Sequence, residues 1–324
     1  MLLRVMHETN LTYSDLISET VMELRMCPRQ ESSQHRLSFE LSIGPAAMVS
    51  SYFDWLGNMV HSFTVNSFHR ELRISSTSVV QTNCAIDDAL EVTDQWPAQF
   101  QDYGTYDYLQ FDGPIVDCEK LRLLAGSLKL QTGMPMGQVI RRMLSAINDG
   151  FAYQKGVTTA ASPITEVLEQ GCGVCQDFTH LMIGMARICR IPARYVSGFL
   201  HGQDEDGGSH YRGWTQTHAW CELLIPSMGW VGFDPTNNCV AGENFVKLAV
   251  GRHYADVPPH RGLYKGSAKE SMTVTVQSNA LKTVPTHLAG ERVRSLDVPT
   301  YGGWRELSLA GQQLAREMQQ QQQQ

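Results

Sequence analysis

The sequence has no long apolar run and only a modest, acidic net charge. Its 324 residues carry a formal charge of −7 at pH 7, and 18% of them are charged. A membrane-spanning helix needs about 20 consecutive apolar residues, and binding to nucleic acid or to an anionic membrane surface depends on basic patches. We therefore expect neither nucleic acid nor a membrane among its partners, and the sequence leaves the oligomeric state open.

The first ten residues, MLLRVMHETN, lack the hydrophobic core of a signal peptide. This absence favours a cytoplasmic location. The eight cysteines are spread between Cys27 and Cys239 without the dense spacing of a disulfide framework. We expect reduced, mostly structural thiols, and reducing conditions also suit a thiol nucleophile.

The first eighty residues are rich in β-type residues with rough alternation. The turn-rich group DWLGN at 54–58 connects two of the expected strands. These features predict an antiparallel, sandwich-like module over residues 1–83. The expected strands are 2–12, 20–25, 35–43, 52–55, 59–65 and 72–80.

Beyond residue 83 the pattern changes from strands alone to helices and strands. Apolar residues at helical spacing predict helices, and short alternating segments predict further strands. We assign residues 84–280, including an irregular connector, to an α+β core, and residues 281–324 to a C-terminal extension. This extension ends in a glutamine run, which indicates disorder at its end. The expected helices are 121–128 and 136–147, and the expected strands are 193–199, 217–225, 230–234 and 271–277.

The stretch GCGVCQDFTH spans residues 171–180. From Cys175 onward the apolar residues follow helical spacing until Pro192, so Cys175 should lie in the first turn of a core helix. Unpaired N–H groups and the positive end of the helix dipole favour a thiolate there. We therefore predict that Cys175 is a nucleophile and that its backbone N–H is a candidate oxyanion donor.

His218 and Asp234 are the candidate partners of this thiol. Alternation leaves each of them on the less apolar face of its strand. If the two strands form a hairpin, these side chains share a face only when three or five residues connect the strands, or when a bulge intervenes. In a Cys–His–Asp triad the imidazole takes the thiol proton, and the carboxylate orients the imidazole and stabilises its charge.

Spacing alone leaves other interpretations open. Cys175 can be a buried structural thiol and His218 a satisfied core histidine. Cys172 and Cys175 form a CxxC pair of the redox type. A zinc site that uses this pair would need His180, His218 or Cys239, but no second pair has metal-ligand spacing.

Four further residues are candidates for the surroundings of the thiol. Gln170 and Gln176 lie close to Cys175 in sequence, so either is a candidate second oxyanion donor. Trp220 and Trp230 flank the predicted imidazole and carboxylate, so both are candidate walls of the acyl pocket. The polar segment 201–213 is a candidate lid.

Five sequence blocks together resemble the bacterial transglutaminase-like superfamily. They are residues 171–180, 184–190, 191–198 (IPARYVSG), 217–220 (THAW) and 229–238 (GWVGFDPTNN). The region around DWLGN resembles the N-terminal module that accompanies this core, so the resemblance covers roughly residues 1–280. It implies a papain-like, transglutaminase-like α+β core with Cys175 as nucleophile, His218 as base and acid, and Asp234 as the orienting group. Thr217 stands where serine is usual and retains a hydroxyl.

The resemblance also implies thiol-dependent acyl transfer at peptide or isopeptide amide bonds. We favour hydrolysis of the cysteine peptidase or amidase type, with a peptide or protein substrate and without a cofactor or metal. Transfer to an amine acceptor, as in protein-glutamine transglutaminases, is the alternative within this chemistry. A non-catalytic peptide-binding module is the alternative of another class.

Overall fold

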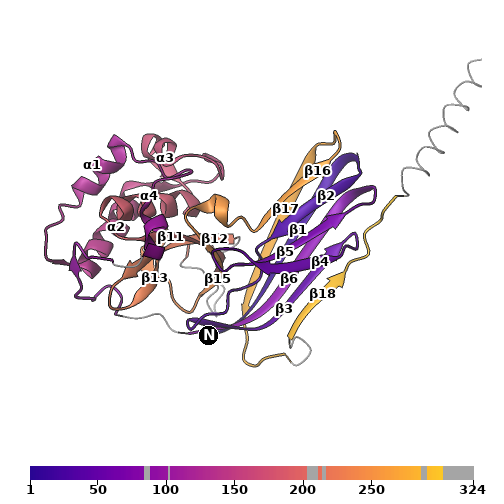
Figure 1. The fold of residues 1–324 in the computed structure, drawn as a ribbon, viewed down its shortest axis with the longest axis horizontal. Coiled ribbons are helices and arrows are strands. Elements are labelled where there is room, and N and C mark those ends of the chain that lie inside the picture. The colour runs from indigo at the N-terminus through magenta and orange to yellow at the C-terminus, as the bar shows by residue number, and fades with distance from the viewer. Residues whose placement is uncertain (84–87, 101–102, 203–210, 214–216, 286–289, 302–324) are drawn as a thin grey trace, which may run out of the picture.

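The structure is a computed structural model that describes residues 1–83, 88–100, 103–202, 211–213, 217–285 and 290–301. Two facing β-sheets form one end of the molecule, and a third sheet with helices around it forms the other end (Figure 1). This arrangement confirms the predicted α+β class with an N-terminal β module. Within the described residues, no helix is long and apolar enough to cross a membrane.

The β module consists of a five-stranded sheet, in the order β17-β1-β6-β3-β18, and a four-stranded sheet, in the order β16-β2-β5-β4. Alternate side chains of β1 are buried along most of its length, as its sequence pattern predicted. The inward residues of both sheets, among them Leu24, Leu41 and Phe63, pack into one core. The strands are β1 Leu2–Ile17, β2 Glu19–Leu24, β3 Gln34–Gly44, β4 Val49–Phe53, β5 Met59–Val65, β6 His69–Thr82, β16 His260–Lys265, β17 Glu270–Ala280 and β18 Gly290–Ser295.

The last three strands return to the β module, which corrects the predicted boundaries. β16 pairs with β2, and β17 pairs with β1 from Leu3↔Ala280 to Tyr13↔Glu270, so this part of the predicted 84–280 core belongs to the module. β18, in the predicted extension, pairs in parallel with β3. These pairings satisfy backbone groups at strand edges that would otherwise be open. The glutamine run at the end of the chain lies outside the described residues.

The helix-covered sheet has the order β14-β13-β12-β11-β15. Helix α4 packs against its central strands β11 and β12 and is buried from Asp177 to Arg187. Both helices predicted before it are present, and α2 buries the predicted apolar stripe. The principal elements are α1 Glu119–Ser127, α2 Met136–Gly150, α3 Ile164–Gln170, α4 Cys175–Ile188, β11 Ala193–Leu200, β12 Thr217–Ile225, β13 Gly229–Asp234, β14 Cys239–Val240 and β15 Phe245–Gly251. The short elements are β7 Gln95–Trp96, β8 Met134–Pro135, β9 Ala152–Tyr153, β10 Cys172–Gly173, η1 Tyr103–Leu109 and η2 Tyr254–Asp256.

Two side chains of the β module dock it onto β15 through backbone hydrogen bonds. Asn58, fully buried at the end of the DWLGN turn, accepts from the N–H of Val250 at 2.8 Å and donates to its carbonyl at 2.9 Å. Gln34 makes the same pair of bonds with Lys247, both at 2.8 Å. Each amide therefore acts like one more residue of a β-ladder and fixes the module against the core.

Candidate active site

Cys175 is the first residue of α4, as the sequence predicted. The segment before it is held by Asp177, whose Oδ2 accepts from the Val174 N–H at 2.8 Å and from the Thr158 hydroxyl at 2.6 Å. At Gly173 a Cβ atom would lie 2.8 Å from Asp177 Oδ2, so only glycine fits against this carboxyl. These contacts fix the thiol at the helix N-terminus, where the N–H groups of the first turn have no partner within the helix.

The register of the β12–β13 hairpin is the predicted one. Ile225 pairs with Gly229 and Cys221 with Phe233, so three residues connect the strands and the ladder is unbroken. His218 and Asp234 consequently stand on one face. Nε2 of His218 lies 2.8 Å from Oδ2 of Asp234, and both side chains are fully buried.

Asp234 is held by the turn that follows it. Its Oδ1 accepts from the backbone N–H of Thr236 at 2.9 Å, and its Oδ2 accepts from the Asn237 side chain at 2.6 Å. These bonds fix the orientation of the carboxylate toward His218. Asn237 also accepts from the backbone N–H of Arg212, which ties the turn to the segment before β12.

The charge on His218 is set by a competition. Burial disfavours the imidazolium, but the Asp234 carboxylate and a hydrogen bond and charge interaction with Cys175 outweigh it and raise the pKa of His218 to about 10. Because Nε2 is occupied by Asp234, Nδ1 is the nitrogen left for the thiol. His218 therefore interacts with Asp234 on one side and with Cys175 on the other, and these contacts favour its charged form.

Gly213 covers the imidazole. Its φ is +84°, and a Cβ atom there would lie 2.8 Å from His218 Nδ1 and 3.7 Å from the Tyr153 hydroxyl. The backbone thus approaches the reactive nitrogen as closely as only glycine allows. In the candidate lid 201–213, residues 203–210 lie outside the described part of the chain.

Cys175 and His218 open onto a cavity of about 210 Å³. Hydroxyl groups surround it, and Lys155 is at its rim. The hydroxyl-bearing residues are Tyr153, Tyr195, Ser197, Thr217 and Tyr254. The described lining contains no carboxylate, so it offers no counter-charge to a cation.

Neither glutamine that we predicted as a second oxyanion donor is available for that role in this arrangement. Gln170 is exposed and lies outside the lining of the cavity. Gln176 does line it, but its side-chain amide donates to the carbonyl of Thr159 at 3.2 Å. Proximity in sequence at a helix end did not show the direction of these two side chains.

The two tryptophans line a different cavity, which corrects their predicted role as walls of the acyl pocket. Trp220 and Trp230 border a space of about 420 Å³ at the junction with the β module. Trp220 lies beside His218, with ring centroids 6.2 Å apart and an angle of 26° between the planes. Trp220 shares a face of β12 with His218, but it packs with Val196 and Phe245 in a cluster separate from the core around α4.

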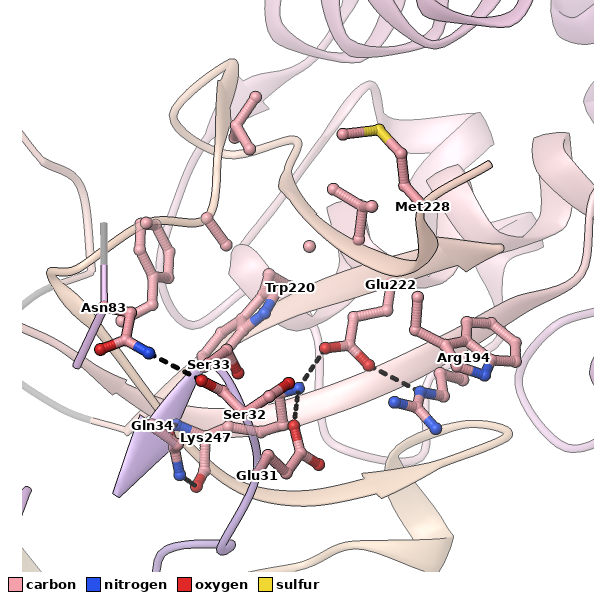
Figure 2. A pocket seen from close by; sticks show the side chains of 17 residues that line it. Glu31, Ser32, Ser33, Gln34, Asn83, Arg194, Trp220, Glu222, Met228 and Lys247 are labelled. Atoms are coloured by element: carbon pink, nitrogen blue, oxygen red, sulfur yellow. Dashed lines mark hydrogen bonds and ion pairs between the residues drawn. The ribbon is translucent and has the colours of Figure 1, made fainter. Parts of the chain in front are cut away.

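Buried charges fill the floor of this second cavity. In Figure 2, Glu222 lies between Lys247 and Arg194, and Lys247 also faces Glu31 of the β module. Burial opposes the charge on Glu222, but Lys247 and Arg194 dominate and lower its pKa to about 2. Since these groups satisfy one another, we assign them to the docking of the module rather than to the chemistry at Cys175.

The geometry supports neither a redox role for Cys172 nor a metal-ligand role for His180. Cys172 and Gly173 form β10, and Val174 is extended with φ −119° and ψ −177°. Three extended residues span roughly 10 Å, whereas bridged cysteines have Cα atoms within about 7 Å. His180 is fully buried, packs against the ring of Tyr195 and has a pKa lowered by burial to about 3, as expected of a neutral core histidine. Among the described residues, no three His, Cys, Asp or Glu side chains gather as metal ligands do.

Sequence reasoning missed several residues of the site. Asn237 and Gly213 position the carboxylate and the imidazole, and Tyr153 and Tyr195 line the cavity. The Asp-Pro-Thr-Asn run at 234–237 carries the signal of an Asx-type turn that would have indicated Asn237. Tyr195 lies in the predicted strand 193–199, but alternation alone does not separate a pocket residue from a core residue.

The sequence matches two families. It matches the transglutaminase-like superfamily over residues 126–235 and the bacterial transglutaminase-like N-terminal region over residues 3–81. An uncharacterized protein of Mycobacterium tuberculosis is 32% identical over 286 residues, which cover 84% of this chain and 91% of the relative. One of Mycobacterium leprae is 29% identical over 284 residues, which cover 86% and 99%.

Two further similarities concern the fold and one part of the sequence. A crystal structure from Cytophaga hutchinsonii, named "Putative Cysteine Protease", has a TM-score of 0.68 and 21% identity and covers 88% of this chain and 93% of its own. At this identity the likeness concerns the fold, and with the family match it confirms the transglutaminase-like core. A protein-glutamine gamma-glutamyltransferase of Pseudomonas aeruginosa is 29% identical over 126 residues, which are 38% of this chain and 19% of that protein.

Proposed function

The chain belongs to the transglutaminase-like superfamily, and from this premise we propose that it is a thiol enzyme that hydrolyses peptide or isopeptide amide bonds. The observation that carries the proposal is the assembly of Cys175, His218 and Asp234 at one buried point. The hydrogen bond of 2.8 Å between His218 and Asp234 and the proximity of the thiol match what nucleophilic catalysis requires.

The proposed reaction follows from the positions of these groups. The Cys175 thiolate attacks the amide carbon, and the carbonyl π electrons move onto oxygen. Protonated His218 then gives its proton to the amine nitrogen as the C–N bond breaks, which leaves a thioester on Cys175. Water attacks this thioester with His218 as base, and the acid and the thiolate are released. Asp234 holds the imidazole in one orientation throughout.

The lining of the cavity favours water over an amine as the acceptor. Lys155 is the charged side chain at the rim, and the described lining has no carboxylate to attract an ammonium group. Hydroxyl groups, by contrast, can hydrogen-bond a water molecule that replaces the leaving amine. Amine transfer is therefore the alternative outcome, and trapping of the acyl group with an added amine separates it from hydrolysis.

The first test is labelling of the thiols by iodoacetamide near neutral pH. We expect Cys175 to react faster than the other seven cysteines, and His218→Ala to abolish the difference. Cys172→Ser is the matched control, because it removes the neighbouring thiol and should leave the labelling of Cys175 unchanged. Equal labelling of all cysteines would reject the enzyme.

The second test identifies the acyl group. The protein is incubated with a peptide library, and the fragment attached to Cys175 is identified by mass, with and without an added primary amine. Loss of the adduct to water alone supports hydrolysis, and an amide of the added amine supports transfer. Peptide binding that persists in Cys175→Ala without any adduct in the native protein would indicate a binding module.

A further inference from the structure

The oxyanion hole of this site needs a second donor, and the cavity offers one that the triad does not use. Tyr195 on β11 is only 2% exposed, yet it lines the cavity that contains Cys175 and His218. No hydrogen bond of its hydroxyl is found among the described residues of the chain. A buried phenol usually has a partner, so one that lines the cavity of the thiol without a partner among the described residues indicates a place for a ligand atom.

The position of Tyr195 distinguishes it from the other two phenols of the cavity. Its ring packs 5.0 Å from that of His180, on the helix whose first residue is Cys175. Tyr153 lies near the imidazole, because one point above Gly213 is 2.8 Å from His218 Nδ1 and 3.7 Å from the Tyr153 hydroxyl, and the charge of Cys175 also acts on it. Tyr254 packs behind Tyr195, with ring centroids 6.2 Å apart.

The two sides of the thiol have different tasks. The imidazole side must deliver a proton to the leaving nitrogen, so the carbonyl oxygen has to point toward the other side, where the N–H of Cys175 lies. Tyr195 packs against α4, the helix that carries this N–H. Burial, followed by the charge of Cys175, raises the pKa of Tyr195 well above its usual value, so its hydroxyl remains a neutral donor.

We propose that the Tyr195 hydroxyl and the backbone N–H of Cys175 together donate hydrogen bonds to the carbonyl oxygen of the acyl group at Cys175. This inference rests on the proposed function. When the C–S bond forms, the π pair moves onto this oxygen, and the two donors stabilise the charge. When the C–N bond breaks and His218 protonates the amine, the pair returns to form the thioester carbonyl. Tyr195 keeps its proton throughout.

The test compares two reactions of the same thiol. Acylation by p-nitrophenyl acetate passes through a tetrahedral oxyanion, whereas alkylation by iodoacetamide is a displacement that forms none. For Tyr195→Phe we expect acylation of Cys175 to slow by ~10²-fold, the usual effect of one oxyanion donor, and alkylation to keep the wild-type rate. Tyr52→Phe is the matched control, because it removes the hydroxyl of an exposed phenol on β4, outside the cavity, and it should change neither rate.

The outcomes separate this inference from the proposed function. Rates are referred to the sites that iodoacetamide titrates, so a partly unfolded preparation does not imitate the effect. Equal acylation rates of wild type and Tyr195→Phe would overturn the role of Tyr195 and leave the proposed function intact. Equal slowing of acylation and alkylation would also overturn this role, because it would indicate an effect on the thiolate. A wild-type Cys175 that neither acylates nor alkylates faster than the other cysteines would reject the proposed function, and this inference with it.

Discussion

His218 Nε2 lies 2.8 Å from Asp234 Oδ2, and both side chains are fully buried. Burial alone would keep the imidazole neutral, as it does for His180. The carboxylate reverses this preference, and the thiol adds to the effect, so the pKa of His218 rises to about 10. The carboxylate therefore orients the imidazole and also stabilises the positive charge of His218 beside the thiol.

Asp234→Asn should uncouple the thiol from the imidazole. Without the carboxylate, burial lowers the pKa of His218, and the stabilised imidazolium is lost. We expect acyl transfer to fall by ~10²–10⁴-fold, and labelling of Cys175 by iodoacetamide to slow at neutral pH. Labelling measured from pH 5 to 10 tests this, and Asp117→Asn, at a surface ion pair with Arg122, is the control. An unchanged labelling profile would contradict the assigned role.

Gly213→Ala should impair the site through one methyl group. The added Cβ would lie 2.8 Å from His218 Nδ1, at a φ of +84°. Gly156→Ala is a matched control, because its φ is +79° and nothing lies within 4 Å of its added Cβ. Both substitutions should cost about 1–2 kcal/mol of stability from backbone strain, but only Gly213→Ala should slow alkylation of Cys175. Equal alkylation rates would mean that Gly213 does not restrain the imidazole.

Asn58→Ala should loosen the β module from the core. It removes both hydrogen bonds to Val250 and leaves a buried N–H and a buried carbonyl without partners. We expect a loss of about 2–4 kcal/mol in the free energy of unfolding, measured by urea denaturation. Asn83→Ala, at an exposed asparagine that donates to Ser32, should change this free energy little. Similar effects of the two substitutions would argue against docking through Asn58.

The elements that the sequence predicted well are those whose signals are local. Spacing and glycines placed Cys175 at the start of α4, and strand alternation with a short connection fixed the side on which His218 and Asp234 meet. The partner of β17 was not predictable, because alternation identifies a strand but not the distant strand that it joins. β15 was missed because it is buried on both faces and therefore has no alternation.

The surroundings of the thiol were harder to predict than the triad. Trp220 and Trp230 are close to the triad in sequence, but their directions depend on how the β module closes the second cavity. Tyr195 faces the thiol only because α4 crosses β11 at that point. Such relationships depend on packing between distant elements, and a single sequence contains no local signal for them.

Buried neutral histidines should make the protein sensitive to acid. Burial, with a contribution from His260, lowers the pKa of His7 from 6.5 to about 4, and its Nδ1 has no partner among the described residues. Between these two values the unfolded chain binds a proton that the folded chain does not. Stability therefore falls as the pH decreases through this window, by up to about 1.4 kcal/mol per pH unit for each such histidine.

His7→Leu should reduce this dependence, because leucine keeps the apolar contact with Phe199 and cannot be protonated. We expect the urea midpoint of the wild type to decrease more steeply between pH 7 and pH 5 than that of the variant. His35→Leu, at an exposed histidine, should retain the wild-type slope. If His7→Leu also retained that slope, the acid sensitivity would have to arise elsewhere, and His180, whose pKa burial lowers to about 3, would be the next residue to replace.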